Sequence, residues 1–391
     1  MAFVEVDYSQ KYKDHERVGG DSFLSRKIKE ENRVISVLSD GLGSGVKANV
    51  LSTLTASMAL NYVTNHMDIV KAAKIIMKTL PVCKVRKISY STFTIVDVEK
   101  NNHVRIVEYD NPPFLLIRQG KMIDLPKATS MLSRRKAKLD ELKQVEFDAE
   151  MGDRIVLFSD GVSQSGMGTR SFPLGWSEPS IRDYVCEIIS RDPDISARDL
   201  SRRIVEKAYI NNEDAAWDDI TCGVINIRKP RELLVMTGPP INPERDKDMA
   251  VIFNEFTGSK ILCGGTTANI ISRELSRPIK VDLSFINPSV PPISHMEGAT
   301  LITEGTITLG KVVELLESGK NPDTLPKNGA VMMVQQLLNH DRIHFYVGTK
   351  INDAHQDPNV PVELEIRRNI IKRIVQSLET HHLKETTLQF I

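Results

Sequence analysis

Short apolar runs rich in β-branched residues alternate with longer helical patterns over the first 228 residues of the chain. Such runs predict buried strands, and a glycine directly after a run predicts the turn that ends it. The predicted strands are 34–38, 91–98, 103–109, 113–118, 154–158 and 221–227, and the predicted helices are 46–64, 68–80, 180–190 and 197–209, the last capped by Ser196. We expect the charged segment 134–143 to be a surface excursion. Strands that follow one another between pairs of helices favour an α+β layered sandwich over a parallel doubly wound sheet.

The pattern changes at Arg228-Lys229-Pro230-Arg231, which we interpret as the junction between a domain of residues 1–228 and a domain of residues 231–391. Beyond this junction the chain repeats a strand, a turn and a helix. The three predicted units are 232–236 with 246–256, 260–263 with 268–275, and 300–303 with 307–317. Repeats of this kind are typical of a smaller α/β domain with a mainly parallel sheet.

Composition narrows the partners that we expect. The 391 residues suggest two domains, and 51 basic residues balance 51 acidic ones, so the net charge gives no reason to expect nucleic acid or an anionic membrane. The chain lacks the run of about 18 apolar residues that a membrane span needs, and charges at positions 5 and 7 argue against a signal peptide. Four scattered cysteines suggest reduced thiols in a cytoplasmic protein: Cys83, Cys186, Cys222 and Cys263.

The tripeptide Ser-Asp-Gly occurs twice, each time directly after a predicted strand. Its carboxylates are Asp40 and Asp160, and a third acidic site, Asp218-Asp219, opens the strand 221–227. An isolated Asp-Gly is most often only a turn. Several carboxylates at strand ends without a histidine cluster, however, suit hard cations such as Mg²⁺ or Mn²⁺. The combination indicates metal-assisted hydrolysis.

Five motifs in a fixed order make the pattern specific. They are Gly19-Gly20-Asp21-Ser22, Ser39-Asp40-Gly41-Leu42-Gly43, Asp110-Asn111-Pro112-Pro113, Gly152-Asp153 with Ser159-Asp160-Gly161, and Asp218-Asp219-Ile220-Thr221. This order resembles the metal-dependent serine/threonine protein phosphatases of type 2C, most of all the bacterial branch named after the sporulation stage II protein E phosphatase. The resemblance covers residues 10–228 approximately. It implies an αββα sandwich of four layers, with two Mn²⁺ or Mg²⁺ ions in a cleft between the sheets.

The resemblance also implies roles for single residues. Asp40 matches the bridging metal ligand, and Gly41 matches a ligand through its backbone carbonyl. Asp160 and Asp218 match the remaining ligands, and Asp21 matches a position beside the metals or their waters. Arg17 either meets the phosphate or is an ordinary surface arginine, and Asp219 either supports the ligands from behind or faces solvent. The implied substrate is phosphoserine or phosphothreonine in a phosphorylated regulatory protein.

The chemistry accounts for these residue types independently of the resemblance. Two metal ions can lower the pKa of a bound water and hold the phosphate oxygens, so no serine or cysteine nucleophile is required. The spacing from Cys222 to Arg228 matches that of thiol phosphatases, but the residues between them form a strand pattern, and we interpret the match as chance. Two alternatives stay open: a non-catalytic phosphatase-like scaffold with a ligand-sensing C-terminal domain, and a phosphomonoesterase for small molecules.

In the C-terminal part, the segment Gly264-Gly265-Thr266-Thr267 joins a predicted strand to a helix. Exposed backbone N–H groups and hydroxyls at a helix start can bind a small anionic ligand such as phosphate. The same residues can equally form a turn and a helix cap. The turns 237–240 and 304–306 would line the same edge of a parallel sheet, which suits a sensing or docking domain.

Overall fold

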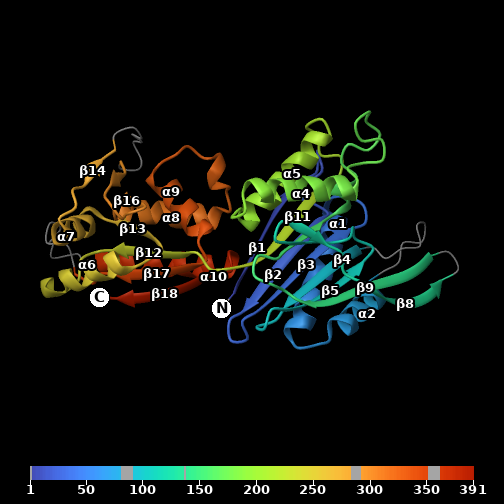
Figure 1. The fold of residues 1–391 in the computed structure, drawn as a ribbon, viewed down its shortest axis with the longest axis horizontal. Coiled ribbons are helices and arrows are strands. Elements are labelled where there is room, and N and C mark those ends of the chain that lie inside the picture. Colours follow the sequence, from blue (N-terminus) through green and yellow to red (C-terminus); the bar gives the residue numbers. More distant parts are fainter. Residues whose placement is uncertain (1, 81–90, 136–137, 283–291, 351–361) are drawn as a thin grey trace. The chain divides into compact units, whose positions relative to one another are not determined.

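The computed structural model describes residues 2–80, 91–135, 138–282, 292–350 and 362–391 (Figure 1). These residues divide into two compact units, Met1–Lys229 and Pro230–Ile391. Among the helices in these ranges, none is both long enough and apolar enough to cross a lipid bilayer. Cys222 and Cys263 are buried free thiols and Cys186 is half-buried, whereas Cys83 lies outside the described residues.

Two antiparallel sheets form the centre of the first unit. The five-stranded sheet has the order β1 (Phe3–Lys11), β11 (Ile220–Arg228), β10 (Arg154–Phe158), β6 (Leu115–Arg118) and β7 (Lys121–Ile123). The six-stranded sheet has the order β2 (Asp21–Ile28), β3 (Arg33–Gly41), β4 (Ser91–Val98), β5 (His103–Tyr109), β9 (Lys138–Asp148) and β8 (Ala128–Arg135).

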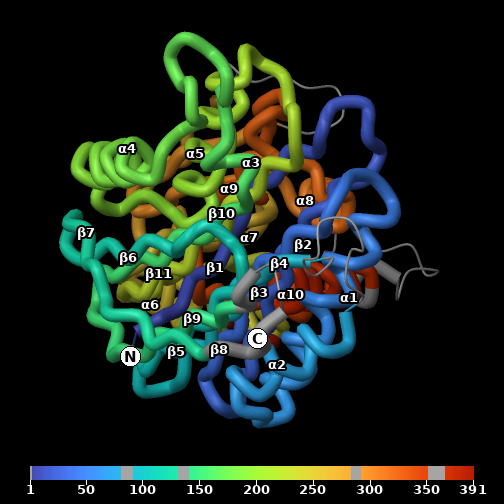
Figure 2. Tube along the Cα trace, turned by 90° about the vertical axis from the view of Figure 1, so that its right-hand side faces the viewer, coloured from blue at the N-terminus to red at the C-terminus, as the bar shows by residue number. Residues whose placement is uncertain are grey.

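Helices cover the outer face of each sheet. Helices α1 (Gly45–Thr64) and α2 (Ile69–Thr79) share a core with the six-stranded sheet, and α4 (Glu178–Arg191) and α5 (Ala197–Asn211) share one with the five-stranded sheet. A third core joins the two sheets, where Phe23 packs so closely on Gly223 that a Cβ there would lie 2.2 Å from its ring. The layers α4/α5, sheet, sheet and α1/α2 follow one another in Figure 2, which confirms the αββα sandwich.

Most predicted elements of the first unit are found where the pattern placed them. The strands 91–98, 103–109 and 154–158 agree to the residue, and Ser196 caps α5 by accepting a hydrogen bond from the Asp199 N–H. Most of the segment 134–143, which was expected to be a surface excursion, forms strands in the hairpin of β8 and β9. Strand β8 is at the edge of its sheet, and edge strands tolerate charged sequences that otherwise argue against a strand.

The second unit contains one seven-stranded sheet with helices on both faces. Its order is β14 (Lys280–Val281), β15 (Ser294–His295), β16 (Leu301–Thr303), β13 (Ser259–Cys263), β12 (Glu232–Thr237), β17 (Arg342–Val347) and β18 (Glu385–Phe390). The five strands from β16 to β18 are parallel, which confirms the mainly parallel sheet. Helices α6 (Asp246–Glu255) and α7 (Gly265–Leu275) pack on one face, and α8 (Thr306–Ser318), α9 (Gly329–Asn339) and α10 (Val362–His381) pack on the other. Short helical turns are α3 (Asp160–Ser163), η1 (Pro243–Arg245) and η2 (Pro322–Thr324).

Candidate active site

Two carboxylates lie side by side at one end of the six-stranded sheet. Strand β2 begins at Asp21 and strand β3 ends at Asp40-Gly41, and the antiparallel register places Asp21 directly opposite Asp40. Directly opposed residues on paired strands have Cβ atoms about 4.5–5.5 Å apart, and like charges at that distance repel. The register therefore sets two acids against each other at a strand end.

The five-stranded sheet contributes two further carboxylates in the same way. Asp160 follows β10 as the first residue of α3, and Asp218 precedes β11. Beyond the paired residues of β10 and β11, Ser159 N–H donates to Thr221 O at 3.0 Å and Thr221 N–H donates to Ser159 Oγ at 3.1 Å. These two bonds hold the ends of the two strands together, so Asp160 and Asp218 emerge at the same end of the sheet.

The electrostatics show that the four acids act on one another. Burial raises the pKa of Asp40 well above its usual range, and the charges of Asp21, Asp160 and Asp218 raise it further. Burial also raises the pKa of Asp160, to which the charge of Asp218 adds, while a hydrogen bond with Asp40 opposes the rise. Charges affect a neighbouring pKa in this way only at short range. The sandwich thus gathers two acids from each sheet at one place.

The surroundings of Asp21 are those of a carboxylate that a cation would compensate. Its side chain is 4% exposed, and its Oδ2 is buried with no hydrogen-bond partner among the described residues. Burial raises the pKa of Asp21 to about 8, hydrogen bonding to the side chains of Thr221 and Ser159 opposes the rise, and the charges of Asp219 and Asp160 add to it. A buried carboxylate oxygen without a donor is costly unless a positive charge compensates it. Oxygen donors of this kind suit Mg²⁺ or Mn²⁺.

The four acids are a candidate set of metal ligands. No group of three or more His, Cys, Asp or Glu side chains within the described ranges has the spacing of a metal site. The strand register and the positions of the strand ends bring four acids together: Asp21, Asp40, Asp160 and Asp218. Ligation is therefore a proposal that rests on donor chemistry.

The glycine after each aspartate is required by backbone packing. A Cβ on Gly41 would lie 2.2 Å from the backbone oxygen of Ala48 in α1, and a Cβ on Gly161 would lie 2.1 Å from the backbone oxygen of Asp219. Real Cβ atoms do not approach backbone oxygens so closely. The repeated Asp-Gly therefore marks two points where a second chain segment passes directly against the aspartate-bearing loop.

Asp219 is buried and links distant parts of the first unit. Its Oδ2 accepts a hydrogen bond from Gly20 N–H at 2.7 Å, and its Oδ1 accepts one from Lys13 N–H at 3.1 Å. These bonds fix the loop between β1 and β2, and with it the start of β2 at Asp21. Arg17 is on the same loop and is exposed, and no hydrogen bond or ion pair among the described residues brings it to the four acids.

One amide side chain contacts an acid, and a second bonds to the strand neighbour of another acid; sequence reasoning identified neither contact. Gln164 Nε2 donates to Asp160 Oδ2 at 2.9 Å, a contact between residues four apart in the chain. Asn111, in the turn of the Asp-Asn-Pro-Pro motif, accepts a hydrogen bond from the hydroxyl of Thr92, which is opposite Asp40 on β4. The spacing of four residues from Asp160 was the one available signal for Gln164.

The thiol that shares the spacing of a cysteine phosphatase is not placed to react. Cys222 is fully buried within β11, and burial raises the pKa of its thiol. Since a thiolate is the nucleophile in such enzymes, a buried neutral thiol cannot perform that role. The match between Cys222 and Arg228 is a coincidence of strand sequence.

The sequence match decides the family. The family model described as Stage II sporulation protein E (SpoIIE) matches residues 30–228. This chain belongs to the SpoIIE family. Asp40, Asp160 and Asp218 lie within the matched residues and Asp21 lies before them. The predicted resemblance to the bacterial type 2C phosphatases is confirmed, while residues 231–391 remain without a recognised family.

Solved structures similar to this chain are distant in sequence. One is the PP2C phosphatase domain with a regulatory-domain fragment of SpoIIE from Bacillus subtilis, which is 16% identical with a TM-score of 0.47. The alignment covers 58% of this chain and 62% of that chain. The RsbU and RsbW domains of a Mycobacterium tuberculosis protein are 16% identical with a TM-score of 0.46, and the alignment covers 65% of this chain and 68% of that chain. A serine/threonine phosphatase of S. agalactiae is 13% identical with a TM-score of 0.41, and the alignment covers 58% of this chain and 100% of that chain. No curated protein matches the chain.

Proposed function

We propose that this chain is a dimetal-dependent phosphatase that hydrolyses phosphoserine or phosphothreonine in a regulatory protein of the bacterial cytoplasm. The observation that supports it best is the convergence of Asp21, Asp40, Asp160 and Asp218 from two sheets, with one carboxylate oxygen left buried and unpartnered. Membership of the SpoIIE family supports a phosphatase activity. The donor chemistry supports a divalent cation requirement.

The proposed roles follow the positions of the side chains. Asp40, the carbonyl of Gly41, Asp160 and Asp218 would hold two Mn²⁺ or Mg²⁺ ions. When bound, such ions supply a hydroxide at neutral pH and shield the charge of the phosphoryl group. Asp21 would accept hydrogen bonds from water at the site through its unpartnered Oδ2.

The loop between β1 and β2 would contribute to substrate binding. Asp219 fixes this loop through the N–H groups of Gly20 and Lys13, and Arg17 is exposed on it. A guanidinium can bind phosphate oxygens through two parallel hydrogen bonds. We assign Arg17 to the incoming phosphate on this basis.

The test is hydrolysis of p-nitrophenyl phosphate and of a phosphothreonine peptide by the full chain, with Mn²⁺, with Mg²⁺ and with EDTA. Asp40→Asn removes a proposed ligand and is expected to abolish turnover. Asp68→Asn is the matched control, because Asp68 caps α2 by accepting from Lys71 N–H and asparagine caps a helix equally well. Cys222→Ala should retain metal-dependent turnover.

The outcomes separate the proposal from its alternatives. Turnover that persists in Asp40→Asn, or no turnover of the wild type with either ion, would reject the proposed reaction. Calorimetric uptake of Mn²⁺ without turnover of any phosphoprotein would indicate a non-catalytic scaffold. Faster hydrolysis of small phosphate esters than of phosphopeptides would assign the site to metabolites.

A further inference from the structure

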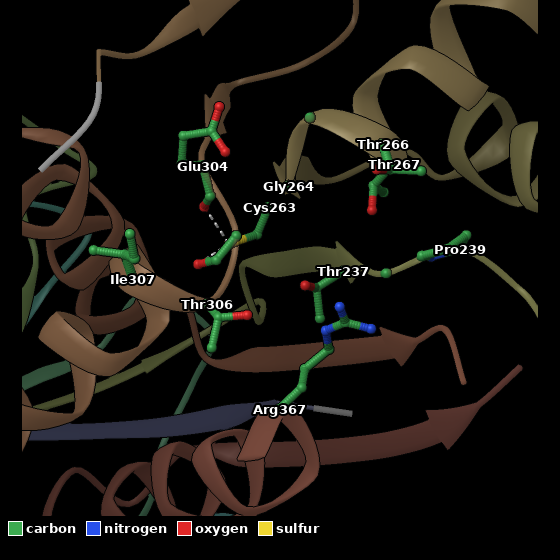
Figure 3. A pocket seen from close by; sticks show the side chains of 13 residues that line it. Thr237, Pro239, Cys263, Gly264, Thr266, Thr267, Glu304, Thr306, Ile307 and Arg367 are labelled. Atoms are coloured by element: carbon green, nitrogen blue, oxygen red, sulfur yellow. Dashed lines mark hydrogen bonds between the residues drawn. The ribbon is translucent and has the colours of Figure 1, made fainter. Parts of the chain in front are cut away.

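A cavity of about 450 Å³ opens at the C-terminal edge of the parallel strands in the second unit (Figure 3). The turns that follow β12, β13 and β16 line it, together with Arg367 of α10. Cavities of this size commonly bind small molecules, and the C-terminal edge of a parallel sheet is where such ligands collect. All the residues that line this cavity belong to the second unit.

Two helix N-termini meet at this cavity. Helix α7 starts after Gly264 and helix α8 starts after Gly305, and neither cap residue supplies a side-chain hydrogen bond. A Cβ built on Gly305 would lie 3.6 Å from the Cα of Gly264, so the two cap glycines are in direct contact range. The first N–H groups of each helix have no partner within the helix, and each N-terminus has a partial positive charge. Their convergence produces a positive potential at one point.

The sheet topology explains why a space remains between the two helices. Helix α7 packs with the core on one face of the sheet, and α8 packs with the core on the other. Their strands, β13 and β16, are neighbours, so the chain leaves adjacent strand ends toward opposite faces. A crevice forms where neighbouring connections diverge in this way.

A buried hydroxyl and a guanidinium point to a ligand independently of the helix ends. Thr267 lines the cavity and its side chain is fully buried, yet its Oγ1 has no hydrogen-bond partner among the described residues. Figure 3 shows Thr266 and Thr267 together at the start of α7, and Arg367 extending from α10 toward Thr237. The Arg367 Nη1 donates to Gly348 O at 3.4 Å, and its guanidinium group brings a positive charge to the cavity. Unpaired buried hydroxyls are rare because each costs stability.

We propose that this cavity binds the phosphate group of a small phosphorylated metabolite that also has hydroxyl groups, such as a nucleotide or a sugar phosphate. The phosphate oxygens would accept hydrogen bonds from the N–H groups at the starts of α7 and α8, from the hydroxyl of Thr267 and from Arg367. The carboxylate of Glu304 is exposed at the same cavity and accepts hydrogen bonds from ligand hydroxyls. Cys263 Sγ donates to Glu304 O at 3.0 Å and fixes the turn that presents this carboxylate.

Isothermal titration calorimetry on the full chain tests the proposal. The probes are inorganic phosphate, AMP and glucose 6-phosphate, each against its unphosphorylated counterpart, adenosine or glucose, with EDTA present so that hydrolysis does not consume the probe. We expect at least one phosphorylated probe to bind. Arg367→Gln and Thr267→Val should each weaken that binding by about tenfold or more, because each removes a donor to a charged group.

Arg373→Gln is the matched control, since Arg373 is on the same helix but is not among the residues that line the cavity; it bonds to Glu317 at 3.0 and 2.6 Å. It should bind the probe as the wild type does.

Thermal unfolding checks that each variant is folded. If Arg367→Gln does not fold, the near-isosteric Thr267→Val alone tests the proposal. No binding of any phosphorylated probe at millimolar concentration, equal binding by the wild type and Thr267→Val, or equal binding of AMP and adenosine would overturn the proposal. Tighter binding of AMP or of glucose 6-phosphate than of phosphate alone would identify which class of metabolite the cavity prefers.

Discussion

Replacing Asp21 with asparagine is expected to raise the unfolding temperature of the first unit at pH 8 in EDTA. Burial raises the pKa of Asp21 from 3.8 to about 8, with the charges of Asp219 and Asp160 adding to the rise and hydrogen bonding to Thr221 and Ser159 opposing it. The folded state therefore holds this proton more tightly than the unfolded state. The resulting contribution to stability is complete below pH 3.8 and is lost as the pH rises toward 8. Asparagine does not ionise, so the variant avoids this loss.

The size of the effect follows from the pKa shift and the buried atom. A shift from 3.8 to about 8 corresponds to about 6 kcal/mol of unfolding free energy at 1.36 kcal/mol per pKa unit. The new amide nitrogen, buried like Oδ2, costs about 1–3 kcal/mol if it finds no acceptor. A net gain of about 3–5 kcal/mol would raise the unfolding temperature by about 6–20 °C for a unit of this size.

The assay is thermal unfolding of wild type, Asp21→Asn and the control Asp68→Asn at pH 5 and pH 8, each with EDTA and with Mn²⁺. The advantage of Asp21→Asn should be large at pH 8 in EDTA and smaller at pH 5, where Asp21 keeps its proton in the folded wild type. Addition of Mn²⁺ should stabilise the wild type more than the variant. An equal advantage at both pH values, or none at pH 8, would refute the electrostatic argument.

Two further substitutions test the packing around the acids. Gly161→Ala places a Cβ 2.1 Å from the backbone oxygen of Asp219 and should cost about 1–3 kcal/mol of unfolding free energy. The control is Gly310→Ala in helix α8, where a Cβ meets no atom within 4 Å, and it should stabilise the protein by about 0.5–1 kcal/mol. Chemical denaturation measures both effects, and equal effects would contradict the steric argument. Asp219→Asn replaces one of the two oxygens that accept from the Gly20 and Lys13 N–H groups with a donor, and it should weaken Mn²⁺ binding by about tenfold. Calorimetry measures this affinity, and an unchanged affinity would show that the loop does not position the acids.

The sequence predicted the strand-end acids because their signal is local. An apolar run followed by Asp-Gly marks the ends of β3 and β10 directly. The pairing of Asp21 with Asp40 was not predictable in the same way, because β2 has a weak apolar alternation and no predicted strand was placed there. The burial of Asp219 depends on two N–H groups about 200 residues earlier in the chain. Such long-range partners leave no trace in local periodicity.

The second unit shows the same division between local and long-range signals. The turn at Gly264 and Gly265 was visible as a glycine pair, although α7 begins at Gly265, three residues earlier than the apolar pattern predicted. Arg367 comes from α10, about 100 residues after that turn, and a single arginine on an amphipathic helix has no feature that links it to a distant loop. Strand β17 does alternate, with Ile343, Phe345 and Val347 buried, so this element was missed although a signal was present.

The pairing of β1 with β11 has a consequence for how the first unit is made. The register runs from Phe3 opposite Arg228 to Lys11 opposite Ile220, so the first strand of the unit pairs with its last strand. A nascent chain therefore has no complete set of acids until Asp218 has been synthesised, and it cannot assemble the site while the five-stranded sheet lacks its closing strand. Contacts so distant in sequence also slow folding, because the connecting chain must be ordered before they form. A fragment cut to residues 30–228 would lack β1, β2 and Asp21, and would leave β11 with an open edge where its first partner belongs.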